Sequence, residues 1–188
     1  MVLFAMLRHG DTDWSADGRI QGRSDPTLTD EARERLRRFK LPEVCARMRI
    51  VTSPLARCVE TAALLGAPHA PREPRIAEMS WGGWEGRRLA DLRAELGPRM
   101  SENEARGWDF RPDGGESPRE VLKRVRAWLA GLTEPTLAVT HRGVIRPVYA
   151  QAAGWDMLGR PPVKLAWDAV HVFRLQESEL SIESVNVR

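Results

Sequence analysis

The sequence predicts an α/β fold, a three-layer sandwich in which a mostly parallel central sheet is flanked by helices on both faces. Short apolar runs alternate along the chain with stretches in which apolar residues recur every three or four positions, the pattern of alternating strands and helices. The first run, Val2–Leu7, lacks polar alternation, which is typical of a strand covered on both faces. Two runs end on a histidine with a glycine close behind, at His9 and His141. Sheets of this class bind ligands beyond the carboxyl ends of their strands.

Composition and charge exclude several classes of protein. Of the 188 residues, 42% are hydrophobic and 29% are charged, and the formal net charge is only +3, values typical of one soluble globular domain, residues 1–188. The arginines are spread along the chain, which favours a solvated surface over nucleic-acid binding. No apolar run approaches the roughly 18 residues of a membrane span. Cys45 and Cys58 lack metal-ligand spacing and are expected to be unpaired thiols. We therefore expect a cytoplasmic monomer or homodimer with no nucleic-acid or membrane partner.

The segment after the first strand is expected to cover the strand end. Asp11–Pro26 is rich in Asp, Gly, Ser and Arg, the composition of an ordered loop. Thr29 or Asp30 can cap the helix that follows, which carries acidic residues in its first turn and extends to about Lys40.

A second strand and helix follow. Arg49–Ser53 is short and apolar at its centre, which indicates a strand. We expect Pro54 at the first position of the next helix, Leu55–Leu65, because the missing N–H of proline costs nothing there. Gly66 is the expected stop of that helix.

The middle of the chain is less regular. Ala67–Pro74 is a proline-punctuated connection, and Arg75–Gly86 is a loop with two tryptophans, three glycines and two glutamates. Leu89–Leu96 is predicted to be helical and to end at Gly97-Pro98. Glu102–Pro118 is polar and rich in Gly and Pro, which indicates an irregular excursion.

Regular structure returns with a capped helix. Ser117 and Glu120 have the spacing of a capping box, ahead of an apolar helical face over Val121–Leu132. Further on, the chain is predicted to form a buried strand, a helix with proline in its first turn and a terminal edge hairpin: Thr136–Thr140, Val144–Ala153 with Pro147, and residues 169–175 with 180–187.

The end of the first strand indicates a phosphate site centred on His9. Arg8 attracts anions, and Gly10 lets the chain turn and lets a ligand approach the backbone closely. Taken alone, a histidine beside an arginine at a strand end is more often structural, so the interpretation depends on further motifs.

Those motifs occur in order along the chain. They are Arg8-His9-Gly10, Ser53-Pro54-Leu55-Ala56-Arg57 continued by Glu60-Thr61-Ala62, Glu78 followed by Trp81-Gly82-Gly83-Trp84-Glu85-Gly86, Gly115-Glu116-Ser117, and Val139-Thr140-His141-Arg142-Gly143. Together they resemble the histidine phosphatase superfamily, the phosphoglycerate-mutase-like family, and they span about residues 2 to 154. The resemblance implies the fold described above and a phosphohistidine mechanism that needs no metal and no cofactor.

The resemblance also implies roles for single residues, which elementary chemistry supports. His9 would be the nucleophile, which requires one free ring nitrogen and the other held as a donor, for which a backbone carbonyl is a suitable partner. Arg8 and Arg57 would clamp the phosphoryl oxygens, because a guanidinium offers forked donors and a permanent charge. His141 would donate to the same oxygens.

Glu78 would protonate the leaving alkoxide and then activate water. Both steps need a carboxyl that titrates nearer neutrality than an exposed glutamate, and Trp81 and Trp84 could desolvate it. Ser15, where the family often has asparagine, together with Gln21 and Gly22, matches family positions near the phosphate.

The expected function is hydrolysis of small phosphorylated metabolites by a phosphoric monoester hydrolase. Candidate substrates are α-ribazole phosphate, sugar phosphates and phosphoglycerates. Two alternatives remain open, namely phosphoglycerate-mutase-type phosphoryl transfer and a non-catalytic module that binds a phosphorylated ligand. Four arginines could form a basic pocket wall for a second anionic group or could be ordinary surface charges: Arg19, Arg23, Arg87 and Arg88.

Overall fold

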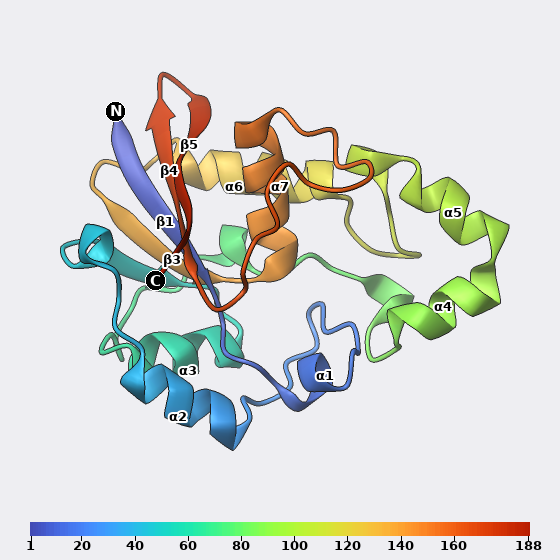
Figure 1. The fold of residues 1–188 in the computed structure, drawn as a ribbon, viewed down its shortest axis with the longest axis horizontal. Helices are drawn as coiled ribbons and strands as arrows, with labels where there is room; N and C mark the ends of the chain where they lie inside the picture. Colours follow the sequence, from blue (N-terminus) through green and yellow to red (C-terminus); the bar gives the residue numbers. More distant parts are fainter.

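A five-stranded sheet forms the centre of the protein in the computed structural model, which describes residues 1–188. The strands lie in the order β2-β3-β1-β4-β5 (Figure 1). Their bounds are β1 Val2–Arg8, β2 Arg49–Thr52, β3 Thr136–Thr140, β4 Val170–Gln176 and β5 Glu179–Val187. Strands β2, β3 and β1 run parallel, and β4 and β5 add an antiparallel hairpin at one edge. The predicted α/β sandwich and its terminal edge hairpin are confirmed.

Helices cover both faces of the sheet. Helices α2 (Asp30–Arg38) and α3 (Ala56–Leu64) lie on one face, and α6 (Pro118–Leu129) and α7 (Arg142–Ala153) lie on the other (Figure 1). Because neighbouring residues of a strand point to opposite faces, β1 supplies both layers of the core. Phe4 packs in the cluster with α6 and α7, whereas Ala5 packs in the cluster on the opposite side.

Four helix predictions need correction. Helix α3 begins at Ala56 with Leu55 as its N-cap, so Pro54 lies outside it. The carboxylate of Asp25 accepts from the first-turn N–H of Ala56 at 2.5 Å, a cap supplied from a distant part of the chain. Helix α7 begins at Arg142, directly after the third strand, so Pro147 lies inside the helix rather than in its first turn.

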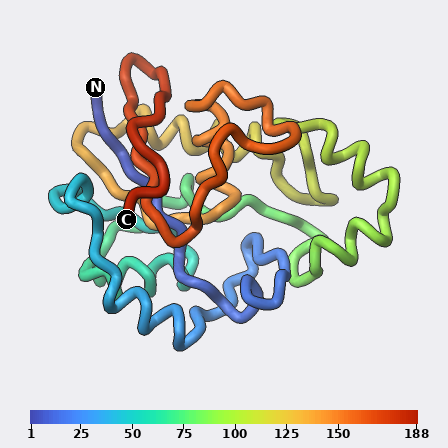
Figure 2. Tube along the Cα trace, viewed as in Figure 1, coloured from blue at the N-terminus to red at the C-terminus, as the bar shows by residue number.

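The other two corrections concern the loops. The segment Asp11–Pro26 contains a short helix, α1 (Asp13–Ala16), held by a capping box. The predicted helix Leu89–Leu96 is confirmed as α4, but a further helix, α5 (Pro98–Glu104), follows it where an irregular chain was expected. Gly97 has a φ of 49°, which lets the chain turn, and proline then occupies the first turn of α5. These two helices extend to one side of the molecule (Figure 2).

Short 3₁₀ turns complete the secondary structure, at Glu43–Cys45, Pro74–Ile76, Gly82–Trp84 and Gly107–Asp109. The capping box at the start of α6 is confirmed, since the Ser117 hydroxyl accepts from the N–H of Glu120 and the Glu120 carboxylate accepts from the N–H of Ser117. Both cysteines are unpaired and buried, as expected. None of the helices combines the length and apolarity that crossing a bilayer requires.

One buried histidine makes the fold sensitive to acid. His171, in β4, is fully buried, and burial lowers its pKa to about 4. Its Nδ1 accepts from the N–H of Asn186 at 3.3 Å, and its Nε2 has no partner. A pKa that is lowered by folding means that the unfolded chain binds the extra proton, so stability is lost as the pH falls below 6.5.

We expect His171→Phe to reduce this loss. Between pH 7.5 and pH 5, the free energy of unfolding of the parent should fall by about 2 kcal/mol more than that of the variant, because Phe cannot be protonated. Urea unfolding at the two pH values measures the difference, with His69→Phe at an exposed position as the control. Equal pH dependence in the parent and His171→Phe would contradict this assignment.

Candidate active site

The carboxyl ends of the three parallel strands bring the predicted site residues together. His9 follows β1, Arg57 lies in the first turn of the helix after β2, and His141 follows β3. The His9 and His141 rings lie 5.1 Å apart, centroid to centroid, in an edge arrangement. Glu78 arrives from the loop after the 3₁₀ turn Pro74–Ile76 and bonds to the backbone of Gly143 beside His141. The site therefore stands where parallel strands of an α/β sheet are expected to bind ligands.

His9 is held in one tautomer. The side chain is only 3% exposed, and its Nδ1 lies 2.7 Å from the carbonyl oxygen of Gly10. Because a carbonyl only accepts, Nδ1 carries the proton and Nε2 keeps its lone pair. Burial lowers the pKa of His9 well below 6.5, and the charges of Arg8 and Arg57 lower it further. The ring is therefore neutral, and its unprotonated Nε2 faces Arg57.

The loop after His9 is fixed by backbone bonds. The N–H of His9 donates to the carbonyl of Thr140 in the neighbouring strand at 3.0 Å. The N–H of Gly10 donates to the hydroxyl of Thr61 at 3.1 Å, and that hydroxyl donates to the carbonyl of Arg57. Thr61 belongs to the continuation of the second motif, one helical turn after Arg57, but sequence reasoning assigned it no role in the site.

Arg57 joins the two histidines to the covering loop, and it is only 1% exposed. Its Nε donates to Nε2 of His9 at 3.2 Å, and its Nη2 lies 3.3 Å from Nδ1 of His141. The remaining donors bond to the carbonyls of Gly22 and Ser24, at 2.8 and 2.7 Å, and to the carboxylate of Asp25 at 3.1 Å.

These contacts leave two of the Arg57 donors on groups that a phosphoryl oxygen could replace. His9 and His141 offer neutral nitrogens as acceptors, whereas a phosphoryl oxygen is charged and accepts more strongly. The contacts to the loop at residues 22–25 can stay in place during that exchange. Arg57 is thus positioned by one half of its guanidinium while the other half faces the site.

His141 is fully buried, and burial lowers its pKa well below 6.5. Arg57 can only donate, so Nδ1 of His141 accepts and the ring proton sits on Nε2, 2.7 Å from the hydroxyl of Ser53. The Cys58 thiol lies 3.4 Å from the same Nε2. In this arrangement His141 orients Arg57, and donation to a phosphoryl oxygen requires a second ring proton on Nδ1. Ser53 and Cys58 are neighbours that sequence reasoning missed, although Ser53 opens the second motif.

Glu78 lies at the edge of the site, where it is shielded from solvent and only 7% exposed. Burial raises the pKa of its carboxyl, although the N–H of Met79 at 2.8 Å, the charge of Arg57 and the N–H of Gly143 partly offset that rise. A Cβ at position 143 would collide with the Glu78 carboxylate, so a larger residue there would displace that carboxylate. Arg124 donates to the carbonyl of Glu78 at 3.2 Å and thereby fixes its backbone.

The two tryptophans of this loop pack against an aromatic ring further along the chain. Trp81 and Trp84 form a cluster with Phe110, with ring centroids 5.8 to 6.4 Å apart. The neighbouring Glu85 anchors the covering loop, since its carboxylate accepts from the N–H groups of Arg23, Ser24 and Trp81. The raised pKa of Glu78 agrees with expectation, and its cause is burial as a whole.

The other expected site residues have different surroundings. Arg8 forms an ion pair with Asp11 at 3.1 Å. The Ser15 hydroxyl belongs to the capping box of α1, in which it accepts from the N–H of Thr12. Gln21 has a buried side-chain oxygen without a partner, which suits a ligand contact. Gly22 has a φ of 56° and presents its carbonyl to Arg57.

The four arginines considered as a basic wall are surface ion pairs. Arg19 and Arg88 both bind Asp17, Arg87 binds Glu95, and Arg23 lies 3.5 Å from Glu116. Their charges are only partly offset, because Asp17 serves two arginines and Glu116 also binds Arg124.

Comparison with known proteins points the same way as this geometry. A family model described as histidine phosphatase superfamily (branch 1) matches residues 4–188. A glucosyl-3-phosphoglycerate phosphatase of Mycolicibacterium vanbaalenii is 31% identical over 178 residues, covering 82% of this chain and 77% of that protein. A 2,3-bisphosphoglycerate-dependent phosphoglycerate mutase of a Methylobacterium species is 29% identical and covers 98% of this chain and 96% of that protein.

Solved structures agree with these matches over nearly the whole chain. A mycobacterial glucosyl-3-phosphoglycerate phosphatase in complex with VO3 superposes with a TM-score of 0.80 at 25% identity, covering 99% of each chain. The protein TTHB049 of Thermus thermophilus superposes with a TM-score of 0.74 at 31% identity, again covering 99% of each chain.

Proposed function

The chain belongs to branch 1 of the histidine phosphatase superfamily and is a phosphatase of that class, and we propose that it forms a phosphohistidine on Nε2 of His9. The observation that carries the proposal is the tautomer of His9, with its proton held by the Gly10 carbonyl and its lone pair facing the site. The substrate we propose is a small phosphomonoester.

The reaction then takes two displacements. In the first, the lone pair of Nε2 attacks phosphorus, the ester P–O bond breaks, and the leaving alkoxide takes the proton of Glu78. The positive charge left on the ring is stabilised by the Gly10 carbonyl that holds Nδ1–H. In the second, Glu78 takes a proton from water while the water oxygen attacks phosphorus. The P–N bond breaks, and its electron pair returns to Nε2 of His9. Arg57 and Arg8 stabilise the charge on the equatorial oxygens throughout.

The pH dependence should report His9 and Glu78. The first step needs His9 neutral, which holds above its lowered pKa, and Glu78 protonated, which holds below its raised pKa. For an alkyl phosphate, kcat/KM should therefore fall at low pH as His9 is protonated and fall again at higher pH as Glu78 ionises.

We expect Glu78→Gln to lower kcat for an alkyl phosphate by about 10² to 10⁴ and to remove the high-pH fall. The loss on p-nitrophenyl phosphate should be smaller for the first step, because p-nitrophenolate leaves without a proton. Pre-steady-state measurement of both substrates, in excess chelator, separates the two steps. A high-pH fall that persisted unchanged in Glu78→Gln would assign the acid to another group.

Two arginines suggest the class of substrate. Arg142 and Arg146 lie one turn apart on α7, where like charges disfavour each other. Neither forms an ion pair. Arg142 instead stacks 5.0 Å from the ring centroid of Trp167, and Arg146 stacks 5.4 Å from that of Trp155. Burial lowers the pKa of both guanidinium groups, and for Arg142 the charges of Arg146 and Arg8 add to that effect.

Two cations that are stacked on aromatic rings but not neutralised are prepared for an anion. Arg142 directly follows His141, so that anion would lie close to the transferred phosphoryl group. We therefore propose a substrate with a second negative group, such as the carboxylate of a phosphoglycerate derivative. The names of the phosphatase relatives, which specify glucosyl-3-phosphoglycerate, support this class.

Arg142→Ala tests the substrate class. We expect kcat/KM for 3-phosphoglycerate or its glucosyl derivative to fall about 10- to 100-fold, the loss of one charge-assisted hydrogen bond, while p-nitrophenyl phosphate changes less than about twofold. Arg47→Ala, at an exposed position, is the matched control. Equal losses of kcat/KM on both substrates would show that Arg142 does not bind a second anionic group of the substrate.

Mutase-type transfer remains the second candidate, because the Methylobacterium mutase matches over nearly the full length of both chains. The chain after Gly86 favours hydrolysis instead, since Arg87 and Arg88 lead directly into α4, with no additional segment there to keep water from the site. Product analysis with labelled phosphoglycerate distinguishes the two, because only hydrolysis yields inorganic phosphate in step with substrate loss.

A further inference from the structure

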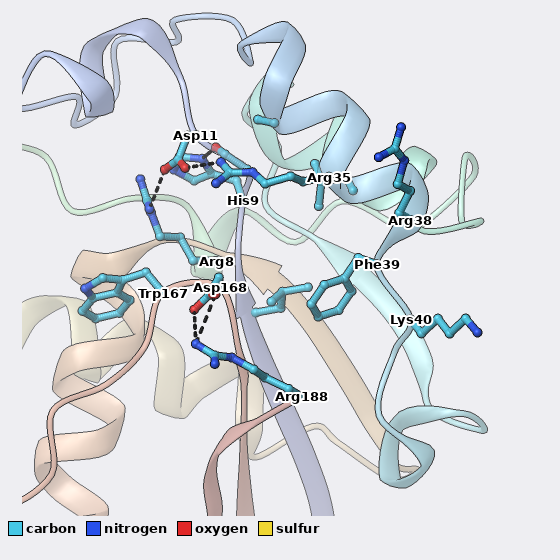
Figure 3. A pocket seen from close by; sticks show the side chains of 14 residues that line it. Arg8, His9, Asp11, Arg35, Arg38, Phe39, Lys40, Trp167, Asp168 and Arg188 are labelled. Atoms are coloured by element: carbon cyan, nitrogen blue, oxygen red, sulfur yellow. Dashed lines mark hydrogen bonds and ion pairs between the residues drawn. The ribbon is translucent and has the colours of Figure 1, made fainter.

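A cavity of about 700 Å³ lies beside the active site, on the side of β1 that faces α2 (Figure 3). His9 and Gly10 form part of its wall, but Arg57, His141 and Glu78 do not line it. It is therefore separate from the place where the phosphoryl group is proposed to react. Its volume is within the range of small-molecule sites, roughly 300 to 1,000 Å³.

The lining combines an apolar surface with excess positive charge. Leu7, Leu36, Phe39 and Trp167 supply apolar side chains, with Trp167 and Phe39 on opposite sides (Figure 3). Five basic side chains line the cavity against two acidic ones. A ligand that satisfies both properties has an apolar body and a negative group.

Both acidic side chains are already engaged. Asp11 pairs with Arg8 and with Arg35, and Asp168 pairs with Arg188 at 3.1 Å. Figure 3 shows these two ion-paired groups on the walls of the same cavity. Arg38 pairs with Glu34 at 3.6 Å, so the positive surplus comes from Lys40 and from the two arginines that share Asp11. This surplus favours an anion over a cation.

We propose that this cavity binds a small amphipathic anion, with a phosphate, sulfonate or carboxylate on an aromatic or aliphatic body, as a second site that modulates phosphoester binding. Asp11 links the two sites. Arg8 adjoins His9 and lowers its pKa through its charge, and its guanidinium is held by Asp11, which also holds Arg35 at the cavity wall.

An anion in the cavity and a phosphoryl group at His9 should weaken each other. Both draw on the positive field of Arg8, and two negative charges at neighbouring sites repel. Linkage requires the effect to be reciprocal, so each ligand raises the dissociation constant of the other by the same factor. This factor reaches a limit, because the two ligands occupy different sites and do not exclude each other.

The test uses 8-anilinonaphthalene-1-sulfonate, a fluorescent aromatic sulfonate that cannot be hydrolysed by a phosphatase. We expect saturable binding at one site, and a dissociation constant that rises with vanadate and then reaches a plateau, within about tenfold. Arg188→Glu should weaken probe binding tenfold or more, while Arg47→Glu should not. The side chain of Arg188 is exposed, so its substitution should not unfold the chain.

Several outcomes would overturn the proposal. These are probe binding that does not saturate, vanadate that displaces the probe without limit, or a dissociation constant that is unchanged in Arg188→Glu. Sedimentation showing that a second copy of the chain covers the cavity would also overturn it. The readout is binding rather than turnover, so failure of the proposed reaction and failure of this site are distinguished.

Discussion

His9→Ala should abolish phosphoester hydrolysis, with kcat for p-nitrophenyl phosphate reduced by on the order of 10⁴ to 10⁶. The reason is specific to this ring. Nε2 is the buried, unprotonated nitrogen that faces Arg57, and alanine removes the atom that would accept the phosphoryl group. Water could still attack in the same electrostatic environment, which sets a small residual rate. The assay measures release of p-nitrophenolate in excess chelator, so that a metal-dependent contaminant does not contribute activity.

The matched control is His69→Ala, because His69 is an exposed histidine outside the site and its loss should leave kcat unchanged. The covalent intermediate gives an independent readout. Rapid quench of the parent with ³²P-labelled substrate should trap label that is stable in base and labile in acid, as expected of a phosphoramidate. The label should be absent in His9→Ala. Full activity in that variant, or label that persists there, would sink the phosphohistidine mechanism.

Much of the fold and the site assembly could be predicted from local signals. The apolar run at Thr136–Thr140 and the capping box at Ser117 each depend on neighbouring residues only, and the structure has both where they were expected. Two strand-end histidines could be placed together without coordinates, because the carboxyl ends of adjacent parallel strands meet at one edge.

What could not be predicted depends on long-range contacts. The start of α3 is set by Asp25, a carboxylate more than thirty positions earlier, so the local rule for proline selected the wrong first residue. The tautomer of His9 depends on which ring nitrogen meets the Gly10 carbonyl, a matter of side-chain rotation. Likewise, Arg142 differs from Arg87 only in having an aromatic ring rather than an acid beside it.

Arg57→Lys and Arg57→Ala should separate the two roles of the buried guanidinium, which are binding the phosphoryl group and holding the covering loop. Lysine keeps the charge but loses the forked N–H donors of the guanidinium, so it cannot bond to His9 and to the loop carbonyls at the same time. We expect kcat/KM to fall about 10² to 10³ in Arg57→Lys, the usual cost of one donor to a developing charge. Arg33→Lys, on the partly exposed ion pair with Glu60, is the control and should change kcat/KM little.

Alanine at position 57 should also cost stability. It leaves the carbonyls of Gly22 and Ser24 without the guanidinium that binds them, in a region where the arginine was 1% exposed, whereas the carboxylate of Asp25 keeps its bond from the N–H of Ala56. A buried polar group left without its partner costs about 1 to 3 kcal/mol, and lysine should recover part of that loss. Urea unfolding measures the free energy of unfolding, and the affinity for vanadate measures how well the site binds a phosphoryl group. If Arg57→Lys kept full affinity for vanadate, charge alone would hold the phosphoryl group, and the forked contact to the two histidines would serve folding only.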